Sequence, residues 1–252
     1  MFLMIRKNIA YNIFNKETLF LRTVYFNTRL ARNEILRKWF EFLQCSIYLN
    51  AFDRTVLSYG KQDFRITKYI DEKGTEEINK FFHDYNFDQS IDYANEVKEE
   101  HAVIKYLNEE EKMLFFNRKG INTPIPFSEE SLGNRTLLNL LPAFLFVAQH
   151  SGMLLIDDFS SGFHNELEEL MVRCFMNTSD KSQMIFVSHS TNLLSTSLLR
   201  PDQIYSVEFD GKNGSHIKRF SDEQPRVAQN LEKMYLSGVF GGLPNYKDAY
   251  EN

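Results

Sequence analysis

Hydrophobic positions recur with a helical period through the first hundred residues. The clearest stripe consists of Leu30, Ile35, Leu36, Trp39, Phe40 and Leu43. Asn33 precedes the second part of this stripe as a candidate N-cap, and Thr75 precedes the run "EEINKFFHDY" in the same way. The more polar run "DQSIDYANEVKEE" (88–100) is a third candidate helix. These patterns predict a mostly helical N-terminal region.

After Glu100 the pattern changes to short β-capable runs, "HAVIKYL", "KMLFFNR" and "NTPIPF", which predict a small antiparallel sheet. From Ser131 onward, helices and strands alternate. The predicted order is the apolar helix "LLNLLPAFLFVAQH" with Pro142 inside it, the strand "MLLIDD", the amphipathic helix "ELEELMVRCFM" and the strand "QMIFVS". A short helix over 191–199 and a hairpin with a glycine turn over 202–220 follow.

Two short apolar strands separated by a helix indicate a parallel sheet that is covered on both faces. The predicted fold class is therefore α/β, with the parallel sheet in residues 128–252 and a mostly helical arm with a few short strands in residues 1–127. Function in such sheets gathers at the carboxyl ends of the strands. Asp157 and Asp158 end one strand, and His189 follows the other.

Each polar position at these strand ends has a functional and a structural interpretation. An acid at the tip of a buried strand costs free energy unless it is paired or holds a cation, so Asp157 and Asp158 are candidates for holding Mg²⁺. They could equally form a turn or cap the next helix. His189 could reach a phosphate or an attacking water, or be an ordinary loop histidine.

The start of the apolar helix is a further candidate, because Ser131 and Gly133 open it. The free N–H groups and the dipole of a helix N-terminus favour an anion. An ordinary capped terminus is the alternative interpretation.

Composition narrows the classes of protein. With 34 acidic residues against 29 basic ones and a net charge of −5, the whole chain is not an electrostatic nucleic-acid binder. Two cysteines, Cys45 and Cys174, are too few for a disulfide framework and indicate reduced, buried thiols. The sequence has no signal-peptide pattern and no apolar run of roughly 20 residues, so a cytoplasmic protein without a membrane span is expected.

The order of these motifs is more specific than any one of them. A helix opens with Ser-x-Gly, an apolar strand ends in Asp-Asp, "SSGFH" follows, and a second apolar strand ends in Ser-His. This order resembles the second half of an ABC-type P-loop ATPase core, with signature motif, Walker B acid, D-loop and switch histidine. More narrowly, the chain is similar to the bacterial AAA-type ATPases related to abortive-infection and restriction-associated proteins. Segments such as "ETLFLRTVYFN" and "NLEKMYLSGVFGGLPNY" share that resemblance.

The resemblance implies ATP and Mg²⁺ as cofactors and assigns catalytic positions. Asp157 would be the Walker B acid that holds Mg²⁺, Asp158 would occupy the catalytic-acid position, and His189 would be the switch histidine.

The resemblance also implies a partner, either a second copy of the chain or a chain that bears a P-loop. Ser131 and Gly133 would contact the γ-phosphate of ATP bound to that partner. Ser161, Gly162 and His164 would form the D-loop at the dimer interface.

Three features depart from the family pattern. No glycine opens the P-loop motif G-x-x-x-x-G-K-[ST], so a P-loop from another chain or from upstream sequence is expected. Charged hydrogen bonds to phosphate contribute roughly 1.5–3 kcal/mol each, so the chain alone is expected to bind ATP weakly. Asp158 stands where the family usually has Glu, which predicts slow hydrolysis, and Asn134 stands where it tends to have a small hydroxyl residue.

Other functions stay open besides an ATPase in phage defence or DNA-linked processes. A non-catalytic module could keep the fold, and its basic cluster would contact a nucleic-acid backbone or form only a solvated helical face. That cluster consists of Arg22, Arg29, Arg32, Arg37 and Lys38. A truncation product would expose apolar strand edges. A metal-only hydrolase would use His164 and His189, but their spacing matches no recognised ligand motif.

Overall fold

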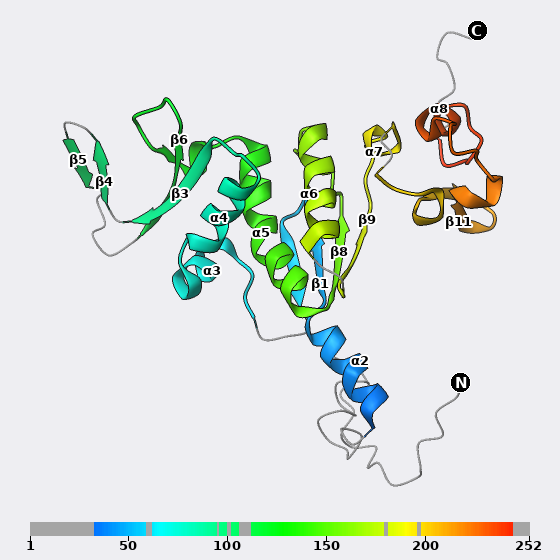
Figure 1. The fold of residues 1–252 in the computed structure, drawn as a ribbon, viewed down its shortest axis with the longest axis horizontal. Helices are drawn as coiled ribbons and strands as arrows, with labels where there is room; N and C mark the ends of the chain where they lie inside the picture. Colours follow the sequence, from blue (N-terminus) through cyan, green and yellow to red (C-terminus); the bar gives the residue numbers. More distant parts are fainter. Residues whose placement is uncertain are drawn as a thin grey trace. The chain divides into compact units, whose positions relative to one another are not determined.

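The computed structural model describes residues 33–58, 62–94, 96–99, 102–105, 112–178, 181–195 and 198–243 (Figure 1). The chain divides into two compact units. The first comprises Met1–Gly162 and Phe175–Val187, and the second comprises Phe163–Cys174 and Ser188–Asn252. Within the described ranges, no helix is long and apolar enough to cross a membrane.

A four-stranded sheet is the centre of the first unit. Its strands lie in the order β2 (Thr55–Ser58), β1 (Ile47–Asn50), β8 (Met153–Asp157) and β9 (Gln183–Phe186). Strands β1, β8 and β9 run parallel, and β2 pairs antiparallel with β1. The predicted α/β class with a parallel sheet is confirmed.

One face of this sheet is buried. In the pairing register Ile47 lies beside Leu154 and Leu49 beside Ile156, so these four side chains share a face, and each is at most 3% exposed. Helix α5 (Leu132–His150) runs beside β1 and β8 (Figure 1) and is apolar along most of its length. It continues through the buried Pro142 as one helix. Burial of this face fixes where β8 ends and thus where its terminal carboxylate lies.

The strands β1 and β2 lie before Glu100, in the mostly helical region of the predicted arm, where the sequence pattern indicated no particular strand. The run 88–100 is not a helix either: it forms β3 (Gln89–Ala94) and β4 (Glu96–Glu99). Ile91 of β3 pairs with Phe116 of β6, and both side chains are fully buried. Pairing with a distant strand therefore outweighs the local helical pattern.

The predicted small antiparallel sheet is confirmed for the runs "KMLFFNR" and "NTPIPF", whereas the run "HAVIKYL" contributes a strand to a separate two-stranded sheet. Strand β6 (Met113–Arg118) lies between β3 and β7 (Ile125–Pro126) in a three-stranded sheet, while β4 pairs with β5 (Ala102–Lys105). A short 3-10 helix, η3 (Phe127–Glu129), then leads toward α5.

Three further helices belong to this unit: α2 (Glu34–Gln44), α3 (Ile66–Lys73) and α4 (Glu76–Asp84). The predicted helices at α2 and α4 are confirmed over these bounds, and Leu30 of the predicted stripe lies outside the described residues.

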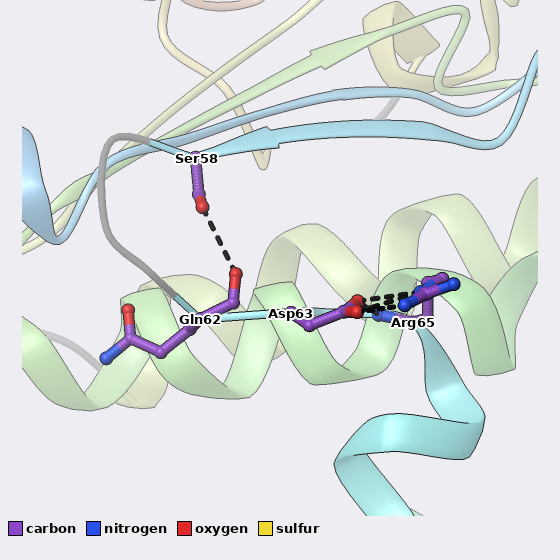
Figure 2. A network of polar contacts seen from close by, with 4 residues as sticks. All are labelled: Ser58, Gln62, Asp63 and Arg65. Carbon is purple, nitrogen blue, oxygen red and sulfur yellow. Dashed lines mark hydrogen bonds and ion pairs between the residues drawn. The ribbon is translucent and has the colours of Figure 1, made fainter.

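Figure 2 shows the polar contacts on either side of the connection between β2 and α3. The Ser58 hydroxyl donates to the Gln62 carbonyl oxygen at 3.3 Å. The Asp63 carboxylate accepts from the Arg65 Nε at 2.9 Å, and this side-chain hydrogen bond lowers the pKa of Asp63 to about 2. Arg65 is the N-cap residue of α3, so these contacts fix where that helix begins.

The second unit contains most of α6 (Asn165–Thr178) and the C-terminal elements. These elements are α7 (Asn192–Ser195), η4 (Pro201–Gln203), β10 (Tyr205–Asp210), β11 (Gly214–Arg219), η5 (Phe220–Glu223) and α8 (Leu231–Leu236). The predicted hairpin is confirmed as the antiparallel pair β10–β11. The hydrophobic core of these C-terminal elements contains Ile204, Phe220, Leu231 and Phe240.

Neither Cys45 nor Cys174 forms a disulfide. Cys174 is fully buried, as predicted, whereas Cys45 is partly exposed. Burial and the nearby Glu41 carboxylate raise the pKa of the Cys45 thiol, which favours its neutral form.

Candidate functional site

Asp157 is the last residue of β8, and side chains of the neighbouring parallel strand hold its carboxylate. Asp157 Oδ2 accepts from the Tyr48 hydroxyl at 3.3 Å and from Asn50 Nδ2 at 3.5 Å. Asp157 Oδ1 accepts from the Asp158 N–H at 3.2 Å. The carboxylate is thus held at the carboxyl end of a central strand, and only neutral donors contact it in these hydrogen bonds.

Asp158 begins a turn in which the backbone takes an unusual conformation. Its φ is +54°, a left-handed value that costs free energy for any residue except glycine. The Ser161 N–H donates to the Asp158 carbonyl oxygen at 2.8 Å, and the Phe159 N–H donates to the Val187 carbonyl oxygen at 2.8 Å. Phe159 is fully buried, with its ring 4.9 Å from that of Phe186. This turn is therefore locked to the ends of β8 and β9.

The same turn contacts the start of α5. A Cβ added at Gly133 would lie 2.8 Å from the Gly162 carbonyl oxygen, and a Cβ added at Gly162 would lie 3.0 Å from Leu132 Cγ. Gly162 also has a φ of +82°. Glycine at both positions permits this close approach. The structure thus brings the predicted signature residues against the predicted D-loop turn.

Ser131 is the N-cap of α5, where its Oγ accepts from the Asn134 N–H at 3.3 Å. Its own N–H donates to Glu130 Oε1 at 2.6 Å, and the same oxygen accepts from Arg118 Nη2 at 2.7 Å. Burial of Glu130 acts to raise its pKa, but the hydrogen bonds from Ser131 and Asn134 and the charge of Arg118 outweigh burial and lower it. Glu130 is therefore an ionised acid that fixes Ser131.

Asn134 has a structural contact of its own. Besides its hydrogen bond to Glu130, its Oδ1 accepts from Gln89 Nε2 at 3.4 Å. The residue that departs from the family pattern thus joins β3 to the start of α5.

In the second unit, His164 lies at the start of α6. Its carbonyl oxygen accepts from the Leu167 N–H at 2.9 Å and from the Glu168 N–H at 3.2 Å, and its Nδ1 accepts from the Glu166 N–H at 3.4 Å. His164 therefore acts as a cap of this helix.

His189 is exposed in the loop that leads into α7. Serine hydroxyls order this loop: Ser188 Oγ accepts from the Ser190 N–H at 3.0 Å, and Ser190 Oγ accepts from the Asn192 N–H at 3.3 Å. His164 and His189 thus belong to the second unit, whereas six of the predicted site residues belong to the first. Those six are Ser131, Gly133, Asp157, Asp158, Ser161 and Gly162.

Sequence reasoning missed Tyr48, Asn50, Glu130 and Glu168. Asn50 ends the apolar run "IYLN", which carries the same signal as "MLLIDD". Glu168 lies three and seven positions before the buried Met171 and Phe175, so an acid on the apolar side of α6 was visible in the sequence. Glu130 carried no comparable signal.

Among the described residues, no three His, Cys, Asp or Glu side chains converge on a point that could hold a metal ion. Asp157 offers one carboxylate. A single carboxylate suits Mg²⁺ that arrives with a nucleotide, because this ion takes its other ligands from water and phosphate oxygens.

Comparison with known proteins identifies the family. The family model described as "AAA domain, putative AbiEii toxin, Type IV TA system" matches residues 14–195, well over half of the chain. No curated protein matches. The matched range includes the β8 turn, the start of α5 and His189. The chain therefore belongs to this AAA family, and with it to the ATPase-like nucleotide-binding domains of mixed α/β fold.

Proposed function

We propose that this chain supplies the signature, Walker B and switch residues of an ABC-type ATPase that hydrolyses Mg-ATP. The arrangement of Asp157 carries the proposal: Tyr48 and Asn50 hold its carboxylate at the end of a central parallel strand. The turn that follows packs against the start of α5, so an acid and a helix N-terminus belong to neighbouring elements of the first unit.

Each residue then has a role that follows from its chemistry. Asp157 would hold Mg²⁺, which when bound with ATP neutralises charge on the phosphates. Asp158 would orient the attacking water and accept its proton, and His189 would hydrogen-bond to the γ-phosphate or that water. Because the side chain of Asp158 is shorter than that of a glutamate, hydrolysis would be slower than with glutamate at this position.

The remaining predicted residues would act across an interface between chains. The Ser131 hydroxyl and the Gly133 N–H would donate to the γ-phosphate of ATP held by the partner. Ser161, Gly162 and His164 would form the D-loop at that interface. The partner is a second copy or a P-loop-bearing chain, and a role in phage defence or a DNA-linked process belongs to this same proposal.

The β9 edge of the central four-stranded sheet supports the proposal that another strand is added there. Among the described residues, β9 pairs only with β8, and the side chains of Ile185 and Val187 are 54% and 52% exposed. Parallel strands are usually covered on both faces, and an open edge is a template for another strand. We propose that residues 128–252 form an ATPase core and that residues 1–127 form its arm. A P-loop strand from another chain or from upstream sequence would complete this core.

The basic cluster offers less support for a nucleic-acid partner. In α2, Lys38 pairs with Glu34 at 2.8 Å and Arg37 pairs with Glu41 at 3.8 Å, as expected of a solvated helical face. The other three members, Arg22, Arg29 and Arg32, lie outside the described residues. Contact with a nucleic-acid backbone stays a prediction.

Phosphate release from Mg-ATP tests the proposed function. The 252-residue chain is co-expressed with the coding sequence that flanks its gene, and the purified assembly is assayed. Asp157→Asn is expected to slow release by about 10²-fold or more, because one charge that stabilises the transition state is lost. Asp222→Asn, at an exposed acid of η5, is the control and should keep the wild-type rate. Equal rates for the wild type and Asp157→Asn would contradict the proposal.

A further inference from the structure

Glu168 is a buried acid whose polar contacts are incomplete. It lies in the first turn of α6 and is only 1% exposed. Its Oε2 is among the few buried side-chain oxygens of the described residues that have no hydrogen-bond partner. Burial raises the pKa of Glu168, although hydrogen bonds from Ser190 and Ser188 act to lower it. A buried carboxylate in such surroundings destabilises the fold, which indicates a role other than stability.

The contacts that Glu168 does make lead to the loop that carries His189. Glu168 Oε1 lies 3.5 Å from Ser188 Oγ, and the Ser190 side chain also donates to this carboxylate. Each of these hydroxyls in turn accepts a backbone N–H: Ser188 Oγ from Ser190, and Ser190 Oγ from Asn192. Residues on both sides of His189 are therefore tied to one buried acid.

The chemistry of a carboxylate explains the direction of the hydrogen bonds that the two serine hydroxyls make. Ser188 Oγ donates its one proton to Glu168 Oε1, where the carboxylate oxygen accepts it, and the Ser190 side chain also hydrogen-bonds to this carboxylate. The lone pairs of both hydroxyls are then left to accept from the backbone amides. The Glu168 N–H also donates to the His164 carbonyl oxygen at 3.2 Å, so the same residue joins the start of α6 to the loop.

We propose that Glu168 is a positioning residue that fixes the loop 188–190 and thereby the imidazole of His189. This inference rests on the proposed function, because it takes the switch role of His189 from there. Glu168 acts through Ser188 and Ser190. Burying its carboxylate lowers the stability of the fold, but it places an acceptor where both hydroxyls reach it.

Amide hydrogen exchange in the 252-residue chain tests the positioning without any nucleotide. Glu168→Ala should speed exchange at the Ser190 and Asn192 amides about tenfold, the effect of losing one hydrogen bond of ordinary strength. Glu168→Gln keeps an acceptor oxygen and should restore most of the protection. Glu166→Gln changes an exposed acid of the same helix and should leave exchange unchanged.

Two exchange results would overturn the proposal. One is unchanged exchange at both loop amides in Glu168→Ala. The other is an equal acceleration at Val172 inside α6, since that would mean general loosening of the unit.

Phosphate release by the co-expressed assembly separates this inference from the proposed function. Glu168→Ala is expected to lower kcat with little change in KM, and Glu168→Gln is expected to rescue it. If His189→Ala abolishes release but Glu168→Ala does not, the positioning role is wrong and the proposed function stands. If His189→Ala has no effect, the proposed role of His189 is wrong, and the inference falls with it whatever the loop amides show.

Discussion

Glu130 in the first unit and Glu168 in the second are both buried acids, but their surroundings shift their pKa values in opposite directions. The hydrogen bonds from the Ser131 N–H and the Asn134 side chain, together with the charge of Arg118, outweigh burial and lower the pKa of Glu130. Among the described residues, the partners of the Glu168 carboxylate are neutral hydroxyls and its Oε2 has none, so burial prevails and raises its pKa. Hydrogen-bond donors and a nearby positive charge together offset the cost of burying a carboxylate.

The pH dependence of stability follows from the raised pKa of Glu168. Its contribution to stability is present below the unfolded value of 4.5 and is lost as the pH rises through the higher folded value. Glu168→Gln carries no charge, so its advantage over the wild type should open above about pH 4.5 and level off once the pH exceeds the raised folded pKa. Thermal unfolding at several pH values measures it. A gap that instead grows toward low pH would contradict the assigned direction.

At the residue level, the sequence predicted the candidate site residues better than it predicted the residues that hydrogen-bond to them. Asp157 and Asp158 were found because a polar pair ends an apolar strand, and that signal depends only on neighbours in the chain. Tyr48 and Asn50 contact Asp157 from more than a hundred residues away. No local pattern encodes such a pairing, because it depends on which strands lie side by side.

Among the elements, α2 and α4 show when a residue type that favours N-capping makes the capping hydrogen bond. Asn33 has an extended backbone, and its Oδ1 accepts from the Ile35 and Leu36 N–H groups at 3.1 and 3.2 Å. Thr75 precedes α4 in the same sequence position, yet its backbone is helical and its side chain makes no capping hydrogen bond. The residue types predicted both helix starts, but the backbone conformation decides whether the side chain can cap.

This difference predicts unequal costs for two similar substitutions. Asn33→Ala should destabilise the chain by about 1 kcal/mol, the usual cost of removing an N-cap hydrogen bond. Thr75→Ala should change the free energy of unfolding by less than about 0.5 kcal/mol. Urea denaturation of both variants and the wild type gives the comparison. Equal losses would mean that the Asn33 side chain does not cap α2.

The strands were harder to predict than the helices because their partners are distant in the chain. Segment 88–100 has helix-compatible spacing, but Ile91 is buried only when β3 lies against β6. Similarly, β1 has four residues and gains its place through parallel pairing with β8. Short strands carry too few residues for a period to be decisive, so tertiary pairing determines them.

At the scale of the whole molecule, the central sheet has two unlike edges within the described residues. Strand β2 closes one edge in the antiparallel direction, and its Leu57 is 65% exposed. Strand β9 leaves the other edge parallel, with Ile185 54% exposed. A P-loop strand must run parallel to β8 to bring its loop to the Asp157 end of the sheet. Only the β9 edge continues the parallel order.

If a P-loop strand adds to β9, a charge at Ile185 should interfere with assembly and not with the chain itself. Ile185→Lys changes an exposed side chain, so its effect on unfolding should stay within about 0.5 kcal/mol. In the assembly the lysine would lie beside the added strand, and desolvation of its charge should weaken association at least about tenfold. Leu57→Lys, on the opposite edge strand, is the matched control and should leave association unchanged. Sedimentation of the co-expressed assembly measures both variants. A loss confined to Leu57→Lys would show that the partner adds to β2 and would contradict the proposed addition to β9.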